Sequence, residues 1–156
     1  DPAYDDVEWF LNAATDALLA AQNLCVQAEI HGLGICYLGT TLYTAADIAR
    51  ILELPKGVIP LTTVVVGYPD ETPGLTDRLP LDAVVHYEKY TDYTAAEIDE
   101  LWAEREESEE TKRLIEENGL ENLAKIFTER RYVRRDNLAV SQAYFALLKE
   151  QGFFNN

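Results

Sequence analysis

Three glycines stand close together in HGLGICYLGT, residues 31–40, and closely spaced glycines can hold the phosphates of a nucleotide. The dinucleotide-binding fingerprint requires GxGxxG between a strand and the helix that follows it, so that the pyrophosphate meets the helix N-terminus. Here the glycines are Gly32, Gly34 and Gly39, and the predicted order is helix, glycines, strand. The stretch therefore fails in both spacing and order. The simpler interpretation is that Gly32 ends a helix in the left-handed conformation and that a short strand follows.

Other catalytic patterns are weaker. The sequence has no GxSxG motif, and its two serines, Ser108 and Ser141, lie far along the chain from His31 and His86, so a hydrolytic triad is not expected. The two histidines and Cys36 lack the spacing of zinc ligands, and a histidine at a helix end more often interacts with the helix dipole. We predict no metal site and no dedicated catalytic acid or base.

Charge narrows the choice of partners. The chain carries 13 Lys and Arg against 28 Asp and Glu, a formal net charge of -15, which would repel nucleic acid and anionic membranes. The acidic run from Glu104 to Glu117 is interpreted as a solvated helix face, with a partner-binding arm as the alternative. The basic cluster, residues 130, 131, 134 and 135, either pairs with those carboxylates, which we favour, or meets a phosphate.

Length and composition indicate one soluble domain. The 156 residues are 47% apolar and 26% charged, close to the average for globular chains. The chain has no apolar run long enough to span a membrane, and its start, DPAYDDVEWF, does not look like a secretory signal. Cys25 and Cys36 form no disulfide framework, which suits a reducing compartment. The expected location is therefore the cytoplasm.

The periodicity predicts alternating helices and strands in the first half. Apolar residues recur at helical spacing from about Asp6 to His31, and this helix is apolar nearly all round in its middle, as expected of a central helix that packs on several sides. Buried strands are predicted at 34–38 and 62–66, with a helix over 45–53 that Thr44 would cap. Residues 69–80 should be irregular, and residues 81–90 extended or mixed. The alternation favours an α/β or α+β core.

The second half is predicted to be a helical arm. Thr94 and Glu97 have the spacing of a capping box, which opens an acidic helix that Gly119 ends. A shorter helix follows over 120–130, and a last one runs from about Asn137 to Gln151. We divide the chain into residues 1–93, a partial core, and 94–156, a C-terminal arm of the same domain.

Taken in order, several segments resemble the nitroreductase family of flavin enzymes, and most closely its NAD(P)H-dependent nitroreductase and flavin reductase group. They are ALLAAQNLCVQAEIHGLGICYLG, LPKGVIPLTTVVVGYPDETPGLTDRLP and VVHYEKY, with RRYVRRDNLAVSQAYFALLKEQGF as a looser match. The resemblance implies an α+β fold, a mixed sheet flanked by helices with a helical C-terminal arm, and a homodimer with FMN at the subunit interface. The predicted first helix would then be the central dimer helix.

The resemblance also implies where the cofactor binds. Tyr37, Leu38 and Gly39 would lie along the flavin ring, where Gly39 lets the backbone approach closely. Family members often show Lys-Pro-Arg-Leu-Pro where this chain has residues 76–80, so Thr76 and Arg78 are the candidates for the FMN phosphate. Thr76 replaces the usual Lys, and Asp77 would repel the phosphate unless it points away.

The implied activity is that of an oxidoreductase. A hydride from NAD(P)H, with NAD or NADP as the co-substrate, would pass through FMN to a small-molecule acceptor such as a nitroaromatic, a quinone or a flavin. The family's N-terminal part, with an Arg-Arg-Ser-x-Arg pattern, has no counterpart before Asp1, so the chain resembles the last two thirds of a member and alone should hold FMN poorly. The alternative is a non-catalytic flavin-binding or protein-interaction module of the same fold.

Overall fold

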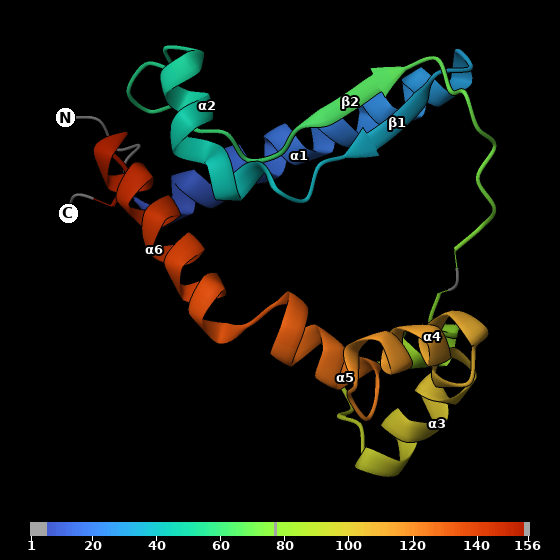
Figure 1. The fold of residues 1–156 in the computed structure, drawn as a ribbon. Coiled ribbons are helices and arrows are strands. Elements are labelled where there is room, and N and C mark those ends of the chain that lie inside the picture. Colours follow the sequence, from blue (N-terminus) through green and yellow to red (C-terminus); the bar gives the residue numbers. More distant parts are fainter. Residues whose placement is uncertain (1–5, 77, 155–156) are drawn as a thin grey trace. The chain divides into compact units, whose positions relative to one another are not determined.

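The computed structural model describes residues 6–76 and 78–154, which form helices and one two-stranded sheet (Figure 1). It divides into two compact units, which are described separately below. The first unit combines residues 1–72 with residues 135–156, and the second comprises residues 73–134. The α+β class predicted from the sequence is confirmed, with the strands confined to the first unit among the described residues.

The first unit is built on the long helix α1 (Val7–Ile30), which ends as predicted. Asp6 begins the helix by accepting the Trp9 N–H at 3.0 Å. His31 is the C-cap, and Gly32 follows with a φ of +74°, the left-handed conformation that glycine adopts without strain. The strands β1 (Gly34–Tyr37) and β2 (Val64–Gly67) pair antiparallel, Ile35 opposite Val66, and lie along α1 (Figure 1).

Within this single chain, much of the surface that these elements were expected to bury is exposed. Val65 on β2 is 51% exposed, and Leu19 on α1 is 60% exposed. Only Cys25 and Ala28 of α1 are buried. The apolar patterns that predicted buried strands and a centrally packed helix therefore correspond to apolar surface within this chain.

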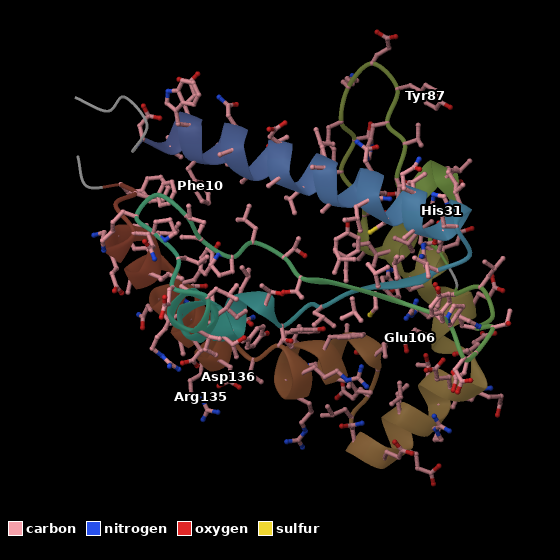
Figure 2. All side chains as sticks on the ribbon, turned by 90° about the horizontal axis from the view of Figure 1, so that it is seen from above. Phe10, His31, Tyr87, Glu106, Arg135 and Asp136 are labelled. Carbon is pink, nitrogen blue, oxygen red and sulfur yellow. The ribbon has the colours of Figure 1, made fainter. Side chains whose placement is uncertain are left out.

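The core of the first unit joins segments far apart in the sequence. A 3₁₀ turn, Thr41–Thr44, leads into α2 (Ala45–Ile51), and Ala45 and Ala49 pack against Leu147 of α6 (Arg134–Glu150). The Tyr144 hydroxyl donates to the Pro60 carbonyl at 3.0 Å, and burial raises the pKa of Tyr144. Near the start of α1, the Phe10 ring (Figure 2) meets the rings of Phe153 and Phe154 edge-on. The last helix is thus tied to both earlier helices of its unit.

In its described residues, the second unit contains the helices α3, α4 and α5 and two short helical turns. A 3₁₀ turn, Leu81–Ala83, precedes a loop, so the segment 81–90 forms no strand. Then come α3 (Ala95–Glu106), α4 (Glu109–Asn118) and α5 (Leu123–Ile126), which continues into a π-helical turn, Phe127–Arg131. Thr111, Leu123 and Ile126 are its most buried residues, with Ile126 only 1% exposed.

The predicted single helix from Thr94 to Gly119 is wrong, because it breaks at Ser108. The Ser108 backbone is extended, and its hydroxyl accepts the Thr111 N–H at 3.2 Å while donating to the Arg105 carbonyl at 2.8 Å. Ser108 therefore ends α3 and caps α4, and Glu109 and Glu110 favour the new N-terminus by their charge.

The predicted helix over 120–130 is also shorter and less regular. Gly119 ends α4 with a φ of +63°, as expected, but Asn122 then caps α5 by accepting the Lys125 N–H at 2.9 Å. The turn that follows closes through the Tyr132 N–H and the Phe127 carbonyl at 2.7 Å, the wider spacing of a π-helix. Helix α6 then starts at Arg134, before the expected Asn137.

The capping box at the start of α3 provides a stability test. Thr94 accepts the Glu97 N–H at 3.3 Å, and the Glu97 carboxylate accepts the Thr94 N–H at 2.7 Å. Replacing Thr94 by alanine should cost about 1 kcal/mol of unfolding free energy, measured by urea denaturation. Thr44 is the matched control, because it precedes α2 without a side-chain cap hydrogen bond. An equal loss in both variants would contradict the assignment.

The same box predicts a pH dependence. Hydrogen bonds from Thr94 lower the pKa of Glu97 below its usual 4.5. A lowered folded-state pKa adds stability that is present above pH 4.5 and lost as the pH falls through the folded pKa. The difference between wild type and Glu97→Gln should therefore shrink in acid, which urea titrations between pH 3 and pH 6 would reveal.

Candidate functional site

The end of β1 places Tyr37, Leu38 and Gly39 together. The Leu38 N–H donates to the Thr63 carbonyl at 2.9 Å, and the Leu38 carbonyl accepts the Thr41 hydroxyl at 3.1 Å. Both backbone groups of Leu38 are therefore used by the fold, and its side chain, 40% exposed, is what it offers to a ligand. A Cβ added at Gly39 would meet nothing within 4 Å. The backbone at Gly39 is accordingly open to close approach.

The Tyr37 side chain contacts helix α1. Its hydroxyl lies 3.4 Å from the Gln22 side-chain oxygen. A hydrogen bond with the buried Cys25 thiol, helped by partial desolvation, raises the pKa of Tyr37. The phenol therefore stays protonated near neutral pH and can act as a hydrogen-bond donor, not as a base. Cys25 and Cys36 are both free thiols.

Thr76 and Arg78 are also neighbours, in the second unit. The Arg78 guanidinium donates to the Thr76 hydroxyl and lies 3.5 Å from the Thr76 carbonyl. The hydroxyl therefore accepts from the arginine and keeps its own proton to donate. Asp77, the residue between them that concerned the sequence prediction, lies outside the described residues.

Arg78 borders a cavity of about 820 Å³ that the sequence did not indicate. Its polar lining comes from Arg78, Glu104, Arg105 and Ser108, and its apolar lining from Leu79, Pro80, Leu81, Val84, Leu101 and Trp102. Arg105 lies over the Trp102 ring, 5.6 Å from its centroid. Helical spacing predicts that Leu101 and Arg105 share one face of a helix. No short sequence pattern predicts that residue 78 lies beside that face.

A second cavity, of about 550 Å³, lies between α3 and α5 and is mostly apolar. Ile98, Trp102 and Phe127 form much of it. Glu106 (Figure 2) and Asn122 also border it, but both already serve α5: the Glu106 carboxylate accepts the Leu123 N–H at 3.1 Å, and Asn122 is the N-cap. This cavity offers less to a charged ligand than the one beside Arg78.

Two members of the basic cluster make contacts other than the pairing favoured from the sequence. Arg135 donates to its neighbour Asp136 at 2.9 Å (Figure 2), and Arg131 lies over the Phe127 ring, 5.4 Å from its centroid. Neither of these contacts uses the acidic run. Within the described residues, no group of three or more His, Cys, Asp or Glu could hold a metal ion, and no helix is long and apolar enough to cross a membrane.

Comparison with known proteins finds a matching family and a solved structure with the same fold. The family model described as "Nitroreductase family" matches residues 3–68. A solved putative oxidoreductase from Bacteroides fragilis superimposes with a TM-score of 0.94 at 48% identity, over 99% of this chain and 63% of that one. Residues 3–68 therefore match the nitroreductase family, and the chain has the fold of that solved oxidoreductase. The α+β nitroreductase fold predicted from the sequence resemblance is thereby confirmed.

Curated relatives of this chain are named as reductases. The FMN reductase (NADPH) of Bacillus subtilis is 40% identical over 86 residues, 55% of this chain and 34% of the relative. An NADPH-dependent oxidoreductase of Staphylococcus aureus is 43% identical over 90 residues, 56% of this chain and 36% of the relative. Each match thus spans about a third of the relative's length. Tyr37, Leu38 and Gly39 lie within residues 3–68, which the family model matches.

Proposed function

We propose that this chain belongs to an FMN-dependent oxidoreductase that uses NADH or NADPH to reduce a small-molecule acceptor. The supporting observation is the 40% identity with a protein named FMN reductase (NADPH), together with side chains that suit the cofactor. When bound, FMN accepts a hydride from the nicotinamide and passes two electrons to the acceptor. The acceptor class we propose is a nitroaromatic, a quinone or a flavin.

The residues present fit FMN in two respects. A flat ring needs a path along the backbone without a side chain, and the open position at Gly39 offers one. A phosphate monoester needs cationic and hydroxyl donors, and the Arg78 guanidinium and Thr76 hydroxyl already lie in contact. In this proposal Tyr37 and Leu38 lie against the ring, Tyr37 as a neutral hydrogen-bond donor and Leu38 as an apolar contact that excludes water.

The proposed enzyme needs no acid–base residue of its own for hydride transfer. The protein's tasks are to hold the ring, to orient the phosphate and to keep water from the reacting face. The identity of the acceptor then depends on which planar molecule can enter beside the ring.

Absorbance spectroscopy tests this function directly. Because this chain alone is expected to hold FMN poorly, the protein is titrated with FMN rather than desalted. It should bind the flavin, and anaerobic NADPH or NADH should bleach the flavin absorbance near 450 nm. Addition of menadione or nitrofurazone should restore the colour and identify the acceptor. Bound flavin that neither nucleotide bleaches would favour the flavin-binding module instead, and absence of flavin binding throughout the titration would refute both.

We also propose that the active form is a homodimer joined through α1. Large apolar side chains of this helix remain exposed, including Leu11, Leu18, Leu19, Leu24 and Ile30, and exposed apolar surface of this extent is typical of an interface. Replacing Leu19 by glutamate should convert a dimer into a monomer in sedimentation velocity experiments. The same substitution at the exposed Lys112 on α4 should leave the dimer intact. A monomeric wild type would refute the proposal.

A further inference from the structure

Arg105 is a second cation beside the cavity that Arg78 borders. Arg78 comes from the loop before the Leu81–Ala83 turn, whereas Arg105 lies in the last turn of α3. Both line the same cavity of about 820 Å³, together with one carboxylate, Glu104. The chain has 13 basic and 28 acidic residues, so a cavity lined by two guanidinium groups and one carboxylate differs in charge from the chain as a whole.

The setting of Arg105 suits anion recognition. Its guanidinium lies over the Trp102 ring, an interaction that engages the flat face of the group. Hydrogen bonding to a phosphate uses the planar edge, where the N–H donors form a fork that matches two phosphate oxygens. Stacking on Trp102 is therefore compatible with phosphate binding and restricts the side chain to fewer rotamers.

The rest of the cavity is apolar and exposed. Leu81 is 77% exposed, Val84 is 55% exposed, and both line the cavity with Trp102. An inorganic anion would leave these side chains in water. A phosphate monoester that carries an organic chain would shield part of this apolar surface while its phosphate meets the arginines.

We propose that Arg105 is a phosphate-binding residue that acts with Arg78 on the phosphate monoester of FMN. This inference rests on the proposed function, since it takes FMN as the cofactor. It extends the Thr76 and Arg78 pair to a cation from α3, and it assigns Glu104 an opposing effect, because its carboxylate borders the same cavity and repels the phosphate.

Comparison of FMN with riboflavin tests the assignment, because riboflavin has the same ring without the phosphate. Dissociation constants for both flavins would be measured by fluorescence quenching for wild type, Arg105→Gln and Arg113→Gln. Arg113 on α4 is the matched control: it is exposed, pairs with Glu117 at 3.7 Å, and does not line the cavity. Arg105→Gln should weaken FMN binding roughly tenfold or more, as expected for loss of a charge-assisted hydrogen bond. Riboflavin binding should change less than twofold, and Arg113→Gln should change neither.

A second variant, expected to strengthen FMN binding, tests the assignment if Arg105→Gln folds poorly. Glu104→Gln removes the carboxylate and should tighten FMN binding without affecting riboflavin. If wild type binds FMN but Arg105→Gln leaves its affinity unchanged, or weakens both flavins equally, Arg105 does not bind the phosphate and the proposed function stands. If wild type binds neither flavin, the proposed function and this inference both fail. Inorganic phosphate that competes with FMN in wild type but not in Arg105→Gln would support the assignment.

Discussion

Replacing Arg78 by alanine is expected to weaken FMN binding by about 1.5 to 3 kcal/mol, roughly a 10- to 150-fold rise in Kd, because a charge-assisted hydrogen bond to the phosphate is lost. The guanidinium already contacts the Thr76 hydroxyl, so its removal also releases the neighbouring donor. Isothermal titration calorimetry with FMN would measure the change. The affinity for riboflavin should stay within twofold of wild type.

Arg50 supplies the control for this experiment. It is exposed on α2 and pairs with Asp47 at 2.9 Å, so Arg50→Ala removes the same charge without touching the cavity. A Kd that rises equally in both variants would indicate a general effect of net charge, and an unchanged Kd in Arg78→Ala would remove Arg78 from the site.

Replacing Ile126 by alanine should cost about 2 to 5 kcal/mol of unfolding free energy, the range for deleting a large aliphatic side chain from a packed core. Ile126 is 1% exposed. It ends α5 just before the π-helical turn, so a cavity there would loosen the contact between α5 and α4. Urea denaturation followed by far-ultraviolet circular dichroism would measure the loss.

Ile98 on α3 is the comparison for this core substitution. The side chain has the same size but is 46% exposed, so Ile98→Ala should cost much less. Equal losses in the two variants would show that Ile126 does not carry the core of the second unit.

The helix ends that could be predicted are those whose cause is local. Gly32 and Gly119 adopt positive φ, and Thr94 with Glu97 forms a capping box, because each depends on residues within one turn. The break at Ser108 also has a local cause, because this residue caps α4. The acidic residues on both sides have high helical propensity, so the sequence predicts one continuous helix across the break. The π-helical turn at Phe127–Arg131 has no comparable signal in the sequence.

Burial was predicted less well than secondary structure. Apolar strands and an apolar helix indicate that a surface is covered, but not by which part of which chain. The exposed valines of β2 and leucines of α1 satisfy the periodicity without being buried in the described residues. Hydrophobic patterns therefore located these elements correctly and misjudged their packing.

The candidate site came partly from resemblance and partly from the fold. Spacing of the glycines alone excluded a dinucleotide fingerprint and gave no role to Tyr37, Leu38 or Gly39. Resemblance to flavin enzymes proposed that role, which remains a prediction. Arg78 and Arg105 are 27 positions apart in the sequence but line the same cavity, one from a loop and the other from a helix. A pattern in a single sequence does not predict that such distant residues lie close together.

The division of the chain has a consequence for the order in which the protein can form. The second unit is continuous, residues 73–134, whereas the first also needs residues 135–156, including Leu147 and the Tyr144 hydroxyl that packs against the Pro60 carbonyl. On the ribosome, the helical insertion can close its own core before the segment around it is complete. Helix α2 lacks its contact with Leu147 until α6 emerges, and during that interval the apolar face of α2 is exposed to chaperones.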